Sequence, residues 1–177
     1  MKEFLDEFLP RLFLELKHEV DFITIPHQGK TDLKRSIPKK LRAWNEKNVH
    51  FIVLHDKDSN DCKKLKKELQ ILCHDAKRPE TLIRIVCFEL ESWFLGDLRS
   101  VGLAFNMLNL YKKQSMSKFK DPDLLANAAD ELIKLIPEYR KSSSPKKIGL
   151  YLSIDDNNSK SFHVFIEGVR RILKKNI

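Results

Sequence analysis

Residues 49–61 read VHFIVLHDKDSND, and this stretch decides the predicted fold. The mostly apolar run at 49–55 is typical of a central strand that is buried on both faces. The turn at 56–61 is rich in residues that cap helix N-termini, and leucines at helical spacing predict a helix over 62–76. Together they predict the first half of a strand–helix–strand unit.

The segments on either side continue this alternation. The run LIRIVCF at 82–88 predicts the next strand, and the β-branched run DFITIP at 21–26 predicts a strand before the first helix of the unit. Between 31 and 44, apolar residues at helical spacing predict that helix, and Pro38 inside it favours a late start. Strands that alternate with helices indicate an α/β fold with a Rossmann-like parallel sheet flanked by helices.

The two ends of the chain are predicted to be helical. Residues 1–16 carry apolar side chains at 3–4 spacing, and Pro10 is expected to kink or split this helix. Residues 1–177 are expected to form one domain, with the α/β core at 1–99 and a mostly helical extension at 100–177. Within that extension we expect a loop with short helical turns at 107–123, helices at 124–135 and 161–174, and a linker at 142–145.

Composition narrows the class of protein. The formal net charge is +8, which favours a polyanionic partner such as DNA or RNA through counterion release. The three cysteines form no CxxC pair, so neither a disulfide framework nor a zinc cluster is expected. The same cysteine usage predicts that the protein is located in a reducing cytoplasm. No apolar run is long enough for a membrane span, and the N-terminus lacks the pattern of a signal peptide.

Four acidic residues form the candidate site. Asp56 and Asp58 directly follow the central strand, and Glu89 and Glu91 follow the next strand. Ligands bind at the carboxyl ends of parallel strands, and if the chain is still extended there, the two glutamates share one face. Clustered carboxylates suit Mg²⁺ or Mn²⁺, with Asp56, Asp58 and Glu91 as the metal ligands. The alternative is structural, since Asp caps helices and the glutamates could start a solvent-facing helix.

Three further residues are expected near the same sheet edge. His27 and Lys30 lie in the turn after the first predicted strand, and His55 ends the central strand. Lys30 could neutralise phosphate charge, and either histidine could act as a base or bind phosphate. His55 also has a structural interpretation as the last residue of a strand. The chain contains no P-loop, no HExxH, no complete EF-hand loop and no nucleophile elbow.

Several motifs resemble a bacterial family of unknown function that is grouped with Toprim-like nucleases. They are the DxD at 56–58, ELESWFLGD at 89–97, SKSFHVF at 159–165 and HQGKTDL at 27–33. The resemblance implies a Toprim-like core that binds Mg²⁺ and cuts or joins phosphodiester bonds. It also implies an ATPase partner and a role in phage defence. Toprim domains open with a strand and a glutamate, and the expectation is that about ten residues carrying both precede Met1.

The leading hypothesis is therefore a Mg²⁺-dependent nuclease or phosphodiesterase. Asp56 and Asp58 would hold the metal, Glu91 with Glu89 would complete or orient the site, and Lys30 would position phosphate. One rival is a phosphatase of the haloacid dehalogenase type, in which Asp56 would be the nucleophile. In those enzymes the DxD follows the first strand, whereas here it follows the second predicted strand. The other rival is a subunit without catalysis that binds nucleic acid or docks on an ATPase.

Overall fold

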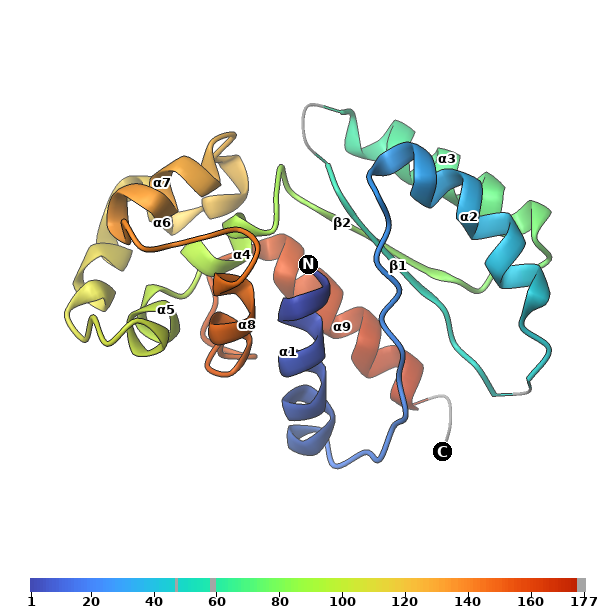
Figure 1. Ribbon diagram of the computed structural model, residues 1–177, viewed down its shortest axis with the longest axis horizontal. Coiled ribbons are helices and arrows are strands. Elements are labelled where there is room, and N and C mark those ends of the chain that lie inside the picture. The colour runs from blue at the N-terminus through green and yellow to red at the C-terminus, as the bar shows by residue number, and fades with distance from the viewer. Residues whose placement is uncertain (47, 58–59, 175–177) are drawn as a thin grey trace.

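In the part of the chain that the structure describes, two short parallel strands form the sheet, and helices cover both of its faces (Figure 1). A computed structural model describes residues 1–46, 48–57 and 60–174. Strand β1 (Ile52–Asp56) pairs in parallel with β2 (Leu82–Val86), in a register that runs from Ile52 opposite Leu82 to Asp56 opposite Val86. The helices are α1 (Lys2–Glu15), α2 (Lys30–Ala43), α3 (Cys62–Asp75), α4 (Glu91–Leu95), α5 (Leu98–Ala104), η1 (Leu110–Ser115), α6 (Ser117–Lys120), η2 (Pro122–Leu124), α7 (Ala128–Leu135), α8 (Ser144–Gly149) and α9 (Lys160–Lys174).

The alternation of side chains along each strand divides the core in two. Val53 and Ile83 point to the face that α2 and α3 cover, where they pack with Leu41 and Leu69. Leu54 and Val86 belong to the other cluster, which fills the space between the sheet, α1, α9 and the helices after β2; Asp56 shares the side of Leu54. The α/β prediction is confirmed, and the end of β1 delivers a carboxylate toward the helical half.

Trp93 of α4 is the centre of the larger core cluster. Its side chain is fully buried, and its ring lies 5.2 Å from the rings of both Phe162 and Phe165 on α9 and 6.2 Å from Phe4 on α1. Aromatic pairs at these separations add to the hydrophobic stabilisation of the core. The cluster draws on residues from both sides of position 99, so the chain ends pack on the middle of the chain, while the division at 99 stays a prediction.

A hydrogen-bond network joins α4 to the start of α9. The indole Nε1 of Trp93 donates to Ser161 Oγ at 2.8 Å, and Ser161 N donates to the buried carboxylate of Asp123 at 2.6 Å. Ser159 caps α9, since its Oγ accepts from Phe162 N at 3.1 Å and donates to Asp123 Oδ1 at 2.7 Å. The SKSF motif is thus a helix cap that satisfies buried polar groups.

A close approach at Gly96 ties the same region to the loop before α9. A Cβ atom at this position would lie 2.0 Å from Asn157 Oδ1, so any other residue would force Asn157 to move. Asn157 donates through Nδ2 to Trp93 O at 2.9 Å and accepts from Ser159 N at 2.8 Å. The glycine of the ELESWFLGD motif therefore allows the contact between the two motifs.

The predicted strand at 21–26 is wrong. These residues are extended but pair with no strand in the described part of the chain, and residues 19–28 make no backbone–backbone hydrogen bond there. Their inward side chains attach them to α1, because the Phe22 ring lies 5.7 Å from Phe13 and Thr24 bonds to Asp6. Residues 21–26 are therefore held by side-chain contacts with α1 and not by hydrogen bonds to a neighbouring strand.

Helix α1 continues through Pro10, so Pro10 does not split it, while a kink there stays a prediction. The expected late start of the next helix is wrong, because α2 begins at Lys30 and continues through Pro38. An internal proline costs a helix about 3 kcal/mol. Burial of apolar residues on both sides of each proline, among them Leu9, Leu12 and Ile37, offsets this cost.

The helical predictions for the C-terminal part are largely confirmed. Short helices η1, α6 and η2 occupy the predicted loop at 107–123, and α7 and α9 fall within one to four residues of their predicted starts. The predicted linker at 142–145 instead leads directly into α8, which begins at Ser144. Within the residues that the structure describes, no helix is both long and apolar enough to span a membrane.

We expect Ser161→Ala to lower the free energy of unfolding by about 1–3 kcal/mol, because the buried Trp93 N–H loses its acceptor. Urea denaturation followed by tryptophan fluorescence measures the change. Ser115→Ala is the matched control, since the exposed Ser115 hydroxyl donates a long hydrogen bond to Lys112 O at 3.2 Å within its own short helix. Equal stabilities for the two variants would contradict the assignment of Ser161 to the core network.

Candidate functional site

Both strands end at the same edge of the sheet, and Asp56 lies at that edge. Asp56 is the last residue of β1 and is opposite Val86, the last residue of β2. The next amide, Lys57 N, donates to Val86 O at 2.8 Å and extends the pairing by one bond. Asp58, the second aspartate of the DxD, lies outside the described residues.

The chain turns sharply after β2, and this turn aims the two glutamates. Phe88 adopts φ = 58°, a left-handed conformation that is uncommon for a bulky residue. The Lys57 ammonium lies 4.4 Å from the centre of the Phe88 ring. Glu89 therefore sits in a turn and Glu91 begins α4, so the chain is no longer extended there and the condition for a shared strand face is not met. A helix does start at Glu91, but the Glu91 side chain is buried rather than solvent-facing.

Asp56, Glu89 and Glu91 nevertheless line one hollow. Its volume is about 210 Å³, and its described lining is completed by Met1, Leu90, Lys141 and Pro145. The lining comes from the chain start, the end of β1, the turn into α4 and the segment before α8. The structure therefore brings together three of the four predicted acidic residues.

Glu91 is fixed by a tyrosine. Tyr139 Oη donates to Glu91 Oε1 at 2.8 Å, and the two residues are only 1% and 5% exposed. Burial, followed by the negative charge of Glu91, raises the pKa of the Tyr139 hydroxyl far above its ordinary value. The hydroxyl thus stays protonated and donates one strong hydrogen bond to a buried carboxylate.

Glu89 connects a lysine to a helix start. Its Oε2 accepts from Lys141 Nζ at 2.6 Å, and its Oε1 accepts from Ala129 N at 2.8 Å in the first turn of α7. Asn127, the residue before α7, makes no side-chain capping bond, and Glu89 takes that role from another part of the chain. An acceptor with negative charge is favourable at a helix N-terminus.

Lys141 supplies positive charge to the hollow. Partial burial alone would lower the pKa of its ammonium group, but the Glu89 hydrogen bond and the charges of Glu91, Glu89 and Asp56 together raise it. The two partners are two residues apart in the sequence, and so are the two glutamates. One short segment therefore binds both glutamates, Tyr139 contacting Glu91 and Lys141 contacting Glu89. Sequence reasoning missed both partners, because the segment EYRK at 138–141 shows no motif or periodicity that singles it out.

The predicted phosphate-binding residues are placed differently. His55 is 4% exposed, lies on the side of β1 that faces α2 and α3, and contacts Asp56 O through Nδ1 at 2.6 Å. His27 Nδ1 lies 3.1 Å from Asp32 Oδ2, and the exposed Lys30 begins α2. None of the three belongs to the described lining of the hollow. Figure 1 shows α2 starting on the side of the molecule toward which the two strands run, and a place for Lys30 and His27 at the sheet edge stays a prediction.

The Asp32 carboxylate stabilises the start of α2 and also holds the His27 ring. Its carboxylate accepts from Gln28 N at 3.1 Å, and this bond and the His27 contact lower the Asp32 pKa. His27 therefore has a structural role in the described conformation. A catalytic role for it stays a prediction.

No metal site is complete among the described residues, in which no group of three or more His, Cys, Asp or Glu side chains is arranged to hold an ion. The chemistry of the hollow still fits a hard cation, because its carboxylate oxygens are the donors that Mg²⁺ and Mn²⁺ prefer. The ligand set of Asp56, Asp58 and Glu91 stays a prediction, since Asp58 lies outside the described residues.

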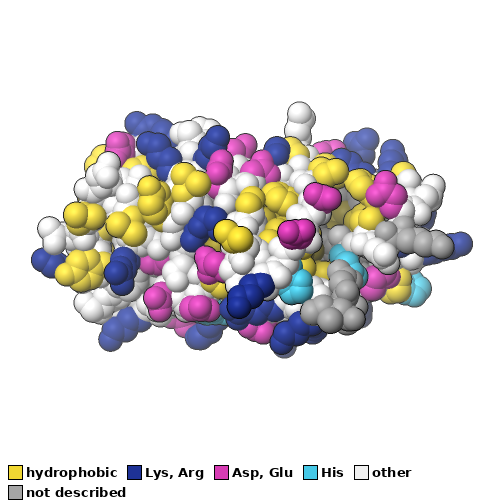
Figure 2. All heavy atoms as spheres, turned by 90° about the horizontal axis from the view of Figure 1, so that it is seen from below, with side chains coloured by type: hydrophobic (Ala, Val, Ile, Leu, Met, Phe, Trp, Pro, Cys, Tyr) yellow, Lys and Arg dark blue, Asp and Glu magenta, His cyan; other side chains and the backbone are white. Residues whose placement is uncertain are grey.

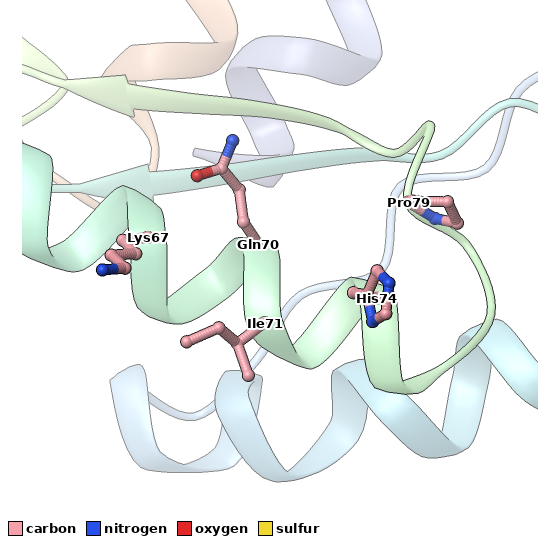
Figure 3. Close-up of a pocket in the computed structure, with 5 residues that line it drawn as sticks. All are labelled: Lys67, Gln70, Ile71, His74 and Pro79. Atoms are coloured by element: carbon pink, nitrogen blue, oxygen red, sulfur yellow. The ribbon is translucent and has the colours of Figure 1, made fainter.

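A second hollow of about 320 Å³ lies along α3 and is lined by Lys67, Gln70, Ile71, His74 and Pro79 (Figure 3). Its lining contains no carboxylate, so it offers no site for a hard cation. On the face seen in Figure 2, lysine and arginine side chains are spread around the rim among acidic and hydrophobic ones. Positive charge on that face is therefore dispersed among the described side chains rather than gathered into one patch.

The fold and the hollow define a class: a mixed α/β protein with a small parallel sheet and an acidic site where its strands end. Within this class, the chain belongs to the family described as Domain of unknown function (DUF4276), whose profile matches residues 1–170. No curated protein and no solved structure matches the chain. The family description states no activity, so the function has to be inferred from the site.

We expect Tyr139→Phe to destabilise the protein by about 1–3 kcal/mol, because the buried Glu91 carboxylate loses a hydrogen-bond donor. Urea denaturation at pH 7 measures the loss. Tyr151→Phe removes a hydroxyl from a residue that is 44% exposed and should change stability by less than about 0.5 kcal/mol. If both variants unfold at the same urea concentration, Glu91 does not depend on Tyr139.

Proposed function

We propose that this protein is a Mg²⁺- or Mn²⁺-dependent enzyme that hydrolyses phosphodiester bonds in nucleic acid. The observation that carries the proposal is the convergence of Asp56, Glu89 and Glu91 on one hollow at the carboxyl edge of the sheet. Carboxylates that share one hollow repel each other to a degree set by their separation, and positive charge nearby relieves this repulsion. A cation site in a protein of charge +8 suits an anionic substrate.

The roles follow from the positions of the side chains. Asp56, together with Asp58, holds the cation, and Glu91, held by Tyr139, completes or orients the site. Bound there, the cation would polarise a phosphoryl oxygen and activate an attacking water. Lys30, which begins α2 near the same sheet edge, positions substrate phosphate.

The resemblance of the DxD, ELESWFLGD and SKSF motifs to Toprim-like nucleases supports this reaction class. It also motivates the further proposals of an ATPase partner and a role in phage defence. The structure adds that the SKSF motif acts at a distance from the hollow, by fixing α9 to Trp93. Its part in the function is to position α4.

Asp56→Asn should reduce Mg²⁺-dependent cleavage of a labelled oligonucleotide by at least about a hundredfold while the protein stays folded, because one metal ligand is lost. Removing one charge from the acidic hollow relieves repulsion, so thermal stability should stay equal or rise. Cleavage is followed on denaturing gels for DNA and RNA substrates.

Asp75→Asn is the control, because it makes the same change on an exposed residue at the far end of α3. Cleavage at wild-type rate by the Asp56→Asn protein rules out the metal mechanism. A large loss of melting temperature instead favours a structural role for the turn.

A second candidate function is binding without catalysis, as a nucleic-acid-binding or ATPase-docking subunit. Glu89 is bonded to Lys141, and Glu91 is bonded to Tyr139. Glutamates with a purely structural role would make the same kind of contact, which favours this second candidate. Purified protein that binds nucleic acid but cleaves none with Mg²⁺ or Mn²⁺ would favour this function.

Nucleic-acid binding, which both the hydrolase and a nucleic-acid-binding subunit require, should weaken steeply with salt because lysines and arginines neutralise phosphates and release counterions. We expect affinity to fall by at least about tenfold between 50 and 200 mM salt. Filter binding at several salt concentrations measures the slope. Absence of binding at low salt would exclude nucleic acid as the partner.

The structure also removes one objection to the phosphatase alternative. The objection to it was that the DxD follows a second strand, but β1 is the first strand in the described part of the chain. In a haloacid dehalogenase-type enzyme Asp56 would form an acyl phosphate. Trapping of labelled phosphate on Asp56 would favour this reaction over phosphodiester hydrolysis.

A further inference from the structure

Arg84 is a buried cation that makes no ion pair with a carboxylate in the described part of the chain. It lies in the middle of β2 and is only 8% exposed. Its Nε donates to Val164 O on α9 at 2.8 Å, and its Nη1 donates to Ile83 O at 2.9 Å. Both acceptors are uncharged carbonyl groups, so they do not neutralise the guanidinium. A buried charge is ordinarily paired with an opposite charge, because its removal from water is costly.

The guanidinium group lies at the outer edge of β2, where the strand has no neighbour among the described residues. Leu82 and Val86 bond to β1 through their backbones, so Ile83, which alternates with them, directs its C=O to the opposite edge. The hydrogen bond from Arg84 to Ile83 O therefore holds the guanidinium at that edge.

Gly168 of α9 gives the guanidinium its place. A Cβ atom at this glycine would lie 2.5 Å from Arg84 Nη2 and 2.9 Å from Cζ, so the flat group rests against the helix backbone. An arginine carries five N–H donors, and the two carbonyl groups leave most of them without a described acceptor. The Nη2 atom bonds to no described residue, and it is not among the fully enclosed polar atoms that lack a partner, so it meets solvent.

A second arginine lies over the same point. Arg171 is three residues after Gly168 on α9, so both share one helix face, and a helical side chain leans toward the turn before its own Cα. Arg171 is exposed and forms no ion pair with any described residue. Burial lowers the pKa of the Arg84 guanidinium, and the positive charge of Arg171 lowers it further. An anion held between the two arginines would offset both effects.

We propose that Arg84 and Arg171 bind a phosphate group at the outer edge of β2. The Arg84 Nη2 and the Arg171 guanidinium donate hydrogen bonds to its oxygens, a contact for which planar guanidinium groups are well suited. Two arginines without acidic partners match the charge of inorganic phosphate or of a phosphate monoester, which carries about two negative charges at pH 7. Neither arginine belongs to the described lining of the acidic hollow, so the site is independent of the proposed hydrolysis.

The test is a titration of the full chain with inorganic phosphate at pH 7 and constant ionic strength, followed by NMR of the arginine Nε–H signals and the α9 amides. Arg171→Met should weaken phosphate binding by at least about tenfold, because a charge-assisted hydrogen bond is lost. Arg170→Met is the matched control, since Arg170 is adjacent but already pairs with Glu167 at 2.8 Å and Asp155 at 3.2 Å. Its phosphate affinity should stay within about twofold of the wild type.

Gly168→Ala tests the geometry without a change of charge. The added methyl group would displace the Arg84 guanidinium, so phosphate binding should weaken by at least about fivefold. A melting temperature within a few degrees of the wild type shows that each variant is folded. If Gly168→Ala does not fold, Arg171→Met decides, because Arg171 is exposed and lies outside the core.

A purely structural role for Arg84, as a link between β2 and α9, gives the opposite results. Wild-type phosphate affinity in Arg171→Met overturns the proposal, and so does equal weakening by Arg170→Met, which would be an effect of net charge alone. A protein that binds no phosphate overturns it as well. Phosphate that shifts neither the Arg84 Nε–H signal nor the amides of 164–171 is bound elsewhere, which also overturns it.

The source of the phosphate is decided by competition. Two oligonucleotides of one sequence are compared, one with a terminal phosphate and one with a terminal hydroxyl. Preferential displacement of inorganic phosphate by the phosphorylated strand assigns the site to the end of a nucleic acid. Absence of competition by both strands assigns it to a small free phosphate compound. Neither result depends on cleavage, so a protein that hydrolyses nothing can still hold this site.

Discussion

The hydrogen bond from the Trp93 indole to Ser161 Oγ is the constraint on which the rest of the structure depends. A buried indole N–H without an acceptor is costly, so the start of α9 must stay beside α4. Asp123 holds Ser161 in turn, and the rings of Phe162 and Phe165 close around the tryptophan. Glu91 is two residues before Trp93, and its position therefore follows from packing that lies outside the hollow.

This dependence explains why the site joins parts of the chain that are distant in sequence. Met1 begins a helix that packs on α8, and Lys141 lies just before α8. Glu89 caps α7, so the turn after β2 and the helical C-terminal part share a carboxylate. A change in the packing of any of these helices would move a group that lines the hollow.

Sequence reasoning predicted three acidic residues that line one hollow and missed the partners of two of them, for a physical reason. The positions of the acidic residues Asp56, Glu89 and Glu91 were predictable because apolar runs in the sequence identify the strands. Parallel strands then bring the residues that follow them to one edge of the sheet. Tyr139 and Lys141 reach the glutamates through tertiary packing, across 48 and 52 residues of sequence, and no local pattern reports such a contact. The fold class was predictable for the same reason, because it follows from the apolar runs of the strands. The segment 21–26 was not, because it has the composition of a strand but packs on a helix.

The hollow contains groups from several separate segments of one chain, and this has a thermodynamic consequence. No fragment of the protein holds Asp56, Glu91 and Lys141 in place, so a ligand that binds among them binds only the complete native state. Such a ligand stabilises the whole molecule by mass action, by an amount that grows with the logarithm of its concentration. In a cell, the lifetime of this protein would then report how much of that ligand is present.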